Sequence, residues 1–255
     1  MKKSFKIFLC ISMIILLFSG SVFAQESEYI LKREIIYQNN RKRTLEDGFV
    51  EIMLGQLNFT QYANDKYLKV TPKPDKIKQD KFGNMYAYYD ATGMLKDEKL
   101  VITIERRLTS STFVTEEPIL ARSNGSITDE NMIYVEPQER IESDHEEIIK
   151  KANEITENLT TDYRKASAIF EYVNTTMTYA TDAASANKGA LAALNGQKGV
   201  CEEFAKIYVA LCRAEEIPAR VVAGYKVEMK DEKEALIDHT WAEIYLDDYG
   251  WLPVV

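Results

Sequence analysis

Two residues in the C-terminal part of the sequence have the types that nucleophilic catalysis requires. Cys201 lies at the start of the run GVCEEFAKIYVALCRAEEIPARVVAGY, and His239 lies in the run DHTWAEIY. A thiolate attacks carbonyl carbon readily, and a neutral imidazole removes protons near pH 7. Cys201 and His239 are therefore the predicted nucleophile and general base. The alternative is a structural pair, in which the thiol is buried in a core and the imidazole is incidental.

The position of Cys201 is compatible with catalysis and with a structural role, because it falls in the first turn of a helix predicted over residues 201–216 and stopped by Pro218. Unpaired backbone N–H groups and the helix dipole stabilise a negative sulfur there, and the same groups could bind an oxyanion. Gly199 is expected to leave the approach to the thiol open. The apolar face is predicted to hold Phe204, Ile207, Tyr208, Leu211, Cys212 and Ala214. An amphipathic helix would direct Glu202, Glu203, Lys206 and Arg213 away from that face.

The other cysteines and histidine do not suggest a metal site. Among three cysteines and two histidines, Cys212 is on the same predicted helix as Cys201, about 16 Å away at 1.5 Å per residue. That separation excludes a disulfide between them, and Cys212 is predicted to be a small buried residue. His145 is expected at the surface, in the capping turn of an acidic helix. We predict no zinc site and no cofactor, and calcium dependence is open because no acidic loop has a recognisable ligand spacing.

The elements around these residues predict an α+β protein. Segments rich in β-branched and aromatic residues, separated by turns, predict a β-sandwich-like domain of about seven strands over residues 25–140. Helical spacing begins after Ser143 or Asp144 as the expected N-cap, and a second helix is expected to begin with Asp162 as its N-cap. A short third helix is predicted within residues 185–197, ending at Asn195-Gly196. Strands over 219–228 and 239–246, and one beginning at Trp251, predict an antiparallel sheet against the Cys201 helix, in a domain over 141–255.

The N-terminus has the features of a secretory signal. Lys2, Lys3 and Lys6 precede an apolar run, and small residues lead to a predicted cut after about Ala24. Removing residues 1–24 removes three lysines and no acid, which takes the formal charge from −8 to −11. Such an acidic chain argues against nucleic acid as a partner. We expect a secreted or extracytoplasmic protein with no transmembrane segment in its mature chain.

The C-terminal motifs resemble those of the transglutaminase-like superfamily of cysteine enzymes. The resemblance covers roughly residues 166–255 and rests on Gly-x-Cys at a helix start, Ile-Pro-Ala-Arg, Gly-Tyr, His-x-Trp-x-Glu and Gly-Trp. It implies a papain-like core in which Cys201 attacks a glutamine or peptide carbonyl and His239 is the base. The acyl group would then pass to an amine or to water, and the substrate would be a protein or peptide. Such an enzyme would be a transglutaminase that crosslinks side chains, or a peptidase or amidase that acts at the cell surface. The preceding β domain is similar to that of bacterial members.

The resemblance also implies a third catalytic residue, an aspartate four residues past the Gly-Trp tryptophan. That position is Val255, which cannot accept a hydrogen bond from an imidazole. Asp238, Asp247 and Asp248 are substitutes without the expected geometry. The family fold normally continues with further strands, so the sequence is expected to be truncated within the core. A catalytically impaired binding or structural module at the cell surface is therefore the alternative function.

Overall fold

The computed structural model describes residues 26–57, 63–111, 122–180, 188–230 and 233–254. The predicted signal segment, the start of the third predicted helix and Val255 lie outside these residues. The α+β class is confirmed, because six strands precede the helices and a three-stranded antiparallel sheet packs against them. No helix in the described ranges is long and apolar enough to cross a membrane.

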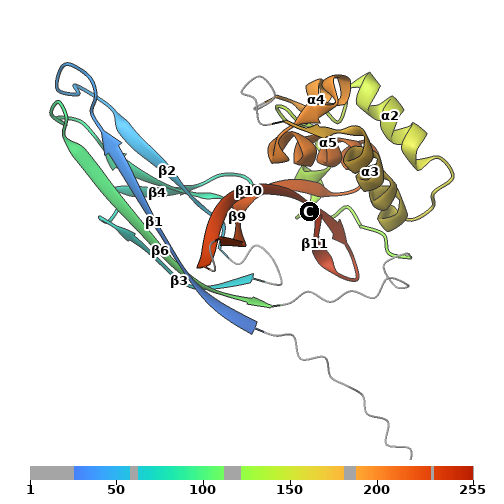
Figure 1. Cartoon of the computed structure of the whole chain (residues 1–255), viewed down its shortest axis with the longest axis horizontal. Coiled ribbons are helices and arrows are strands. Elements are labelled where there is room, and N and C mark those ends of the chain that lie inside the picture. The colour runs from blue at the N-terminus through green and yellow to red at the C-terminus, as the bar shows by residue number, and fades with distance from the viewer. Residues whose placement is uncertain (1–25, 58–62, 112–121, 181–187, 231–232, 255) are drawn as a thin grey trace, which may run out of the picture.

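The N-terminal strands form two three-stranded antiparallel sheets (Figure 1). One sheet has the order β1-β6-β3 and the other β2-β5-β4. Alternating side chains from the two sheets build one hydrophobic cluster, in which Ile102 of β6 and Ala87 of β5 are fully buried. The strands are β1 (Glu26–Gln38), β2 (Phe49–Gly55), β3 (Ala63–Thr71), β4 (Lys76–Gln79), β5 (Met85–Asp90) and β6 (Lys99–Ser111).

The C-terminal elements surround a second hydrophobic cluster, which begins at Ile141. Figure 1 shows helices α2 to α5 grouped on one side of the β9–β11 sheet. The helical elements are η1 (Met132–Tyr134), α2 (Glu146–Thr156), α3 (Asp162–Thr176), α4 (Ala190–Gly196) and α5 (Cys201–Ala214). The strands are β7 (Thr178–Tyr179), β8 (Lys198–Gly199), β9 (Ala219–Lys230), β10 (Lys233–Leu246) and β11 (Gly250–Val254).

Two predicted helix starts differ from the observed ones. The N-cap of α2 is His145 rather than Ser143 or Asp144, because the imidazole Nδ1 accepts the Glu147 N–H at 3.3 Å. The N-cap of α3 is Thr161, so Asp162 is the first helical residue. The Asp162 carboxylate accepts the Gly125 N–H at 2.8 Å, which ties α3 to the connecting segment before it.

Helix α5 is not the amphipathic helix that the sequence predicted. It ends at Ala214, two residues earlier than expected, and it is buried on several sides by α2, α3, α4, β9 and β10. Glu203, Lys206 and Arg213, predicted to face elsewhere, are all buried. These charges are accommodated because each binds backbone groups of other segments. Arg213, for example, donates to the Ala219 carbonyl at 2.9 Å, and burial lowers its pKa to about 10.

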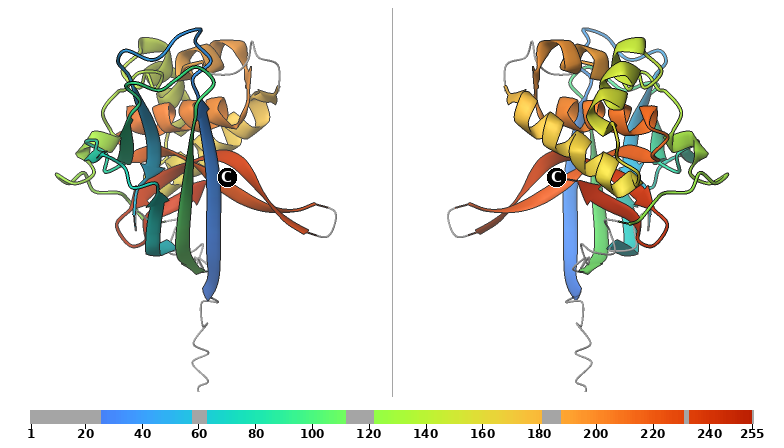
Figure 2. Two further views of the ribbon diagram at one scale, coloured as in Figure 1. Left: turned by 90° about the vertical axis from the view of Figure 1, so that its left-hand side faces the viewer. Right: turned by 90° about the vertical axis from the view of Figure 1, so that its right-hand side faces the viewer.

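The sheet beside α5 has the order β11-β10-β9 and is antiparallel throughout. β10 begins six residues before His239, and with β9 it extends from the molecule as a long two-stranded ribbon (Figure 2). β11 pairs with β10 only between Ala242 and Leu246. Among the described residues, the stretch of β10 at His239 is therefore paired with β9 alone.

Candidate active site

Cys201 is the first residue of α5, as predicted. The preceding residue, Val200, has an extended backbone and is the N-cap. Its carbonyl accepts the N–H groups of Glu203 and Phe204, which closes the first turn. The Cys201 side chain is half-buried and forms no disulfide. The thiol thus lies where the N–H groups of a helix start are directed.

A buried carboxylate holds the chain that leads into Cys201. Glu203 has no exposed surface, and its two carboxylate oxygens accept the Val200 N–H at 3.2 Å and the Lys188 N–H at 2.9 Å. Gly199 lies against this side chain, since a Cβ there would be 2.3 Å from the Glu203 Cβ. The observed reason for a glycine at 199 is therefore this contact with Glu203.

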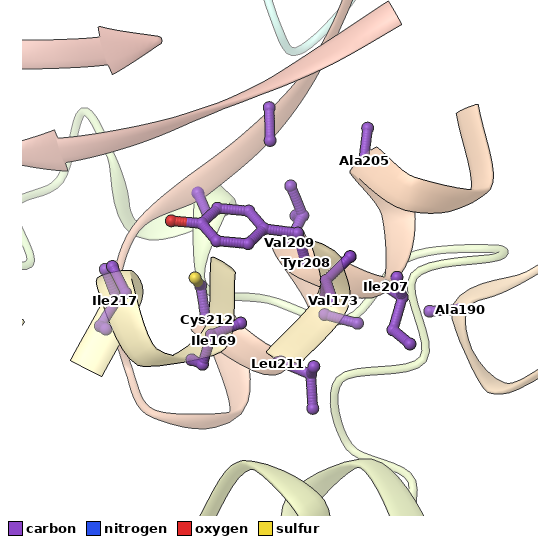
Figure 3. Packing of buried hydrophobic residues seen from close by; sticks show 14 of the residues in the cluster. Ile169, Val173, Ala190, Ala205, Ile207, Tyr208, Val209, Leu211, Cys212 and Ile217 are labelled. Atoms are coloured by element: carbon purple, nitrogen blue, oxygen red, sulfur yellow. The ribbon is translucent and has the colours of Figure 1, made fainter. Parts of the chain in front are cut away.

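Cys212 has the structural role that the sequence predicted. It is fully buried within the second hydrophobic cluster, among Tyr208, Leu211 and Ile217 (Figure 3). Burial raises the pKa of its thiol far above the ordinary value, with the Tyr208 hydroxyl acting in the opposite direction. The two cysteines therefore differ sharply in environment although one helix carries both.

His239 lies on β10 opposite Gly224 of β9. Its ring is stacked on that of Trp241, with centroids 6.3 Å apart and planes 21° from parallel. Gly224 makes room for the tryptophan, because a Cβ there would lie 2.8 Å from the Trp241 Cη2 atom. The Gly-Tyr motif on β9 and the His-x-Trp motif on β10 are thus two sides of one contact.

The environment of His239 favours its neutral form. Its pKa is lowered from about 6.5, first because burial removes water from the ring and second because the Lys226 ammonium is nearby. The Glu228 carboxylate has the opposite effect, and it forms an ion pair with Lys226. A neutral imidazole is the form that a general base requires.

A buried ion pair also holds the tryptophan, through a hydrogen bond to its indole N–H. The Glu243 carboxylate, with no exposed surface, accepts Trp241 Nε1–H at 3.3 Å and Arg220 Nε–H at 2.8 Å. The Arg220 guanidinium lies over the Trp251 ring, 4.0 Å from its centroid. Arg220, Glu243 and the two tryptophans of the sequence motifs therefore form one network of contacts, which reaches His239 through Trp241.

Cys201 and His239 both line one pocket of about 190 Å³. α3 contributes its side chains at 170, 173 and 174, and α5 contributes one face with spacing i, i+3, i+4 and i+7. The sequence-predicted pair is therefore brought to a common cavity. The lining residues are Phe170, Val173, Asn174, Tyr179, Cys201, Phe204, Ala205, Tyr208, His239, Thr240, Trp241, Ala242 and Val254.

The aspartates considered as substitutes for the third catalytic residue have other partners or positions. Asp247 accepts the Ser126 N–H at 3.0 Å, and Asp248 accepts the Ser123 hydroxyl at 3.1 Å. Both therefore fasten the connecting segment to the turn between β10 and β11. Asp238 is exposed on β10, next to His239 in sequence, and Val255 lies outside the described residues.

Sequence reasoning missed most of the pocket wall. Phe170 of α3 is 39% exposed and lines the pocket. Tyr179 of β7 is 61% exposed and lines it as well. A wide apolar stripe on a helix does not distinguish a core position from a pocket position, so the sequence carried no signal for Phe170.

Comparison with known proteins supports the fold. A family model described as the transglutaminase-like superfamily matches residues 149–254. A candidate cysteine protease from Cytophaga hutchinsonii is 18% identical with a TM-score of 0.64, and the match covers 90% of this chain and 77% of that one. The periplasmic domain of TgpA from Pseudomonas aeruginosa is 16% identical with a TM-score of 0.44, over 91% and 70%.

A search of curated proteins found no match to the chain. The family model spans the elements from α2 to β11, and these carry Cys201, His239 and the network behind them. Residues 149–254 therefore match the transglutaminase-like superfamily, the family that the sequence motifs indicated.

Proposed function

We propose that this protein is an exported cysteine enzyme that transfers an acyl group from an amide, a glutamine side chain or a peptide bond, to an amine or to water. The observation that carries the proposal is the common pocket of Cys201, at a helix start, and His239, on the adjacent strand. The lowered pKa of the imidazole supports its role as a base.

The chemistry follows from these two groups. His239 takes the thiol proton as the Cys201 sulfur bonds to the amide carbon, and the N–H groups at the start of α5 that precede those bonded to Val200 stabilise the oxyanion. The C–N bond then breaks, the departing nitrogen receives the proton from His239, and a thioester remains. An incoming amine or water attacks the thioester while His239 takes its proton. The C–S bond breaks, and the proton returns to the sulfur.

The test is incubation with a labelled primary amine and two acyl donors, a glutamine-containing peptide and a peptide without glutamine. Covalent amine incorporation indicates transfer, and release of shortened or deamidated peptide indicates hydrolysis. Cys201→Ala is expected to abolish both products. Cys212→Ala is the matched control, a cysteine on the same helix outside the pocket, and it should keep both. Activity that survives Cys201→Ala would refute the proposal.

Export is a separate part of the proposal and rests on residues 1–24, which lie outside the described residues. N-terminal sequencing of the protein recovered from its native cell envelope or medium should start near Gln25. Recovery from the cytoplasm with Met1 retained would contradict export without affecting the catalytic proposal.

A further inference from the structure

The pocket beside Cys201 has aromatic side chains exposed at its edge. Phe170 on α3 is 39% exposed and Tyr179 on β7 is 61% exposed, yet both line the pocket. The Tyr179 ring also contacts the Phe204 ring, with centroids 6.0 Å apart and planes at 45°. Exposed aromatic groups that converge on a cavity are typical of sites that bind apolar or aromatic ligands.

The deeper wall is apolar and closely packed. Val173, Ala205 and Tyr208 are nearly fully buried and line the same pocket. The cavity of about 190 Å³ exceeds the roughly 150 Å³ of an engineered apolar cavity that binds benzene. One aromatic ring or one branched aliphatic side chain therefore fits the space.

The described part of the lining offers an ionised ligand group no carboxylate or cationic Lys or Arg side chain as a counter-charge. Within the described residues, the lining holds no carboxylate, ammonium or guanidinium. Its polar side chains, apart from the tyrosine and tryptophan groups, are Cys201, His239, Asn174 and Thr240. A charged side chain entering this pocket would lose its water without gaining an opposite charge.

We propose that the pocket binds a large uncharged apolar side chain, preferably an aromatic ring, on the residue of a peptide donor whose carbonyl Cys201 attacks. The inference rests on the proposed function and narrows its substrate class. It makes peptide bonds that follow aromatic or large aliphatic residues the preferred donors. Phe170 and Tyr179 are then the residues that determine specificity.

The first experiment compares acyl donors that differ only in the residue supplying the carbonyl. Fluorogenic anilides of acetylated phenylalanine, leucine, glutamine, glutamate and lysine serve as donors. We expect kcat/KM for phenylalanine and leucine to exceed that for glutamate and lysine at least about tenfold. Equal values across the five donors, or a preference for a charged residue, would overturn the inference.

Variants of the wall provide the second experiment. Phe170→Ala should lower kcat/KM for the phenylalanine donor about tenfold and leave the ratio of glutamate to lysine unchanged. Phe49→Ala is the matched control, because Phe49 is 66% exposed on β2 of the N-terminal sheets. Asn174→Lys, at an exposed lining position, should raise kcat/KM for the glutamate donor relative to kcat/KM for the lysine donor. A wild-type profile in both pocket variants would refute the assignment.

A third measurement separates this inference from the proposed function. Alkylation of Cys201 by iodoacetamide is followed with acetyl-phenylalaninamide or acetyl-glutamate amide present. The aromatic amide should slow alkylation and the acidic amide should not, whether the amide only binds or also acylates the thiol. Selective protection without turnover of any donor would reject the enzyme and keep the pocket. Turnover with neither preference nor selective protection would keep the enzyme and reject the pocket.

Discussion

The two cysteines of α5 show how residue environment decides reactivity. Cys201 is partly exposed at the helix start, while Cys212 has no exposed surface and a raised pKa. Iodoacetamide at neutral pH is therefore expected to modify Cys201 in the folded protein and Cys212 only after unfolding. Peptide mapping by mass spectrometry measures both sites. Cys201→Ala should abolish native labelling, and equal modification of both cysteines would contradict the assignment.

His239 predicts a pH dependence whose sign follows from its surroundings. Because its folded pKa is below about 6.5, the neutral base persists to lower pH than in a free imidazole, and activity should persist with it. The unfolded chain binds this proton more readily, so acidification below about pH 6.5 also destabilises the fold through this group. The acid limb of kcat/KM measures the shift.

Lys226 and Glu228 shift the pKa of His239 in opposite directions, so substituting each of them tests the origin of the acid limb of kcat/KM. Lys226→Gln removes the cation that lowers the His239 pKa, so the acid limb should move to higher pH. Glu228→Gln removes the anion that raises it, so the limb should move to lower pH. Shifts in the same direction would show that another group titrates in this range.

At the scale of elements, the contact between β9 and β10 sets the position of His239. Gly224→Ala places a methyl carbon about 2.8 Å from Trp241, so the ring must move and the stacked imidazole with it. We expect changed tryptophan fluorescence and a lower kcat, with KM little affected. Gly196→Ala is the control, because no atom lies within 4 Å of its added Cβ. Unchanged kcat in Gly224→Ala would show that the stack does not position the base.

The sequence predicted the elements that carry a clear period and missed the others. β6 was predictable because Ile102 and Ile104 alternate toward a core, and both are buried. On β5 two polar-tipped aromatic residues, Tyr86 and Tyr88, alternate as well, but the buried side is that of Ala87 and Tyr89, so alternation there does not identify the core face. β4 was missed because all four of its residues are exposed, so no buried face repeats along it.

The candidate site shows the same division. Cys201 and His239 could be chosen from their chemistry and spacing, and the pocket contains both. The buried partners of Glu203 and Arg213 could not be predicted, because they are backbone groups distant along the chain. A pattern of side-chain types does not indicate which backbone groups will form hydrogen bonds with a buried charged side chain.

At the scale of the whole molecule, we propose a division into an N-terminal β domain over residues 25–140 and a core over 141–255, because the described residues form two hydrophobic clusters. We propose that stability and the pocket can be varied separately. Ile102→Ala empties a fully buried position of the first cluster and should cost about 2–5 kcal/mol in a urea titration. Ile77→Ala, at a 54% exposed position of β4, is the control with a much smaller cost.

The same variant tests whether the pocket depends on the first cluster. Under conditions where Ile102→Ala remains folded, alkylation of Cys201 should proceed within about twofold of the wild-type rate. The reason is that a packing change at one site has little energetic effect on a site with which it shares no contacts. A large change in that rate would show that the two clusters are coupled.

The buried charges of α5 also determine its rotation about its own axis. A turn of one residue rotates every side chain by about 100°, and would carry Glu203, Lys206 and Arg213 away from the backbone groups that they bind. Three buried charges would then lose their partners at once. A wholly apolar helix could pack against its neighbours in several rotations about its axis, but the buried charges of α5 favour the observed rotation. Cys201, the first residue of that helix, is therefore oriented by residues that take no part in its chemistry.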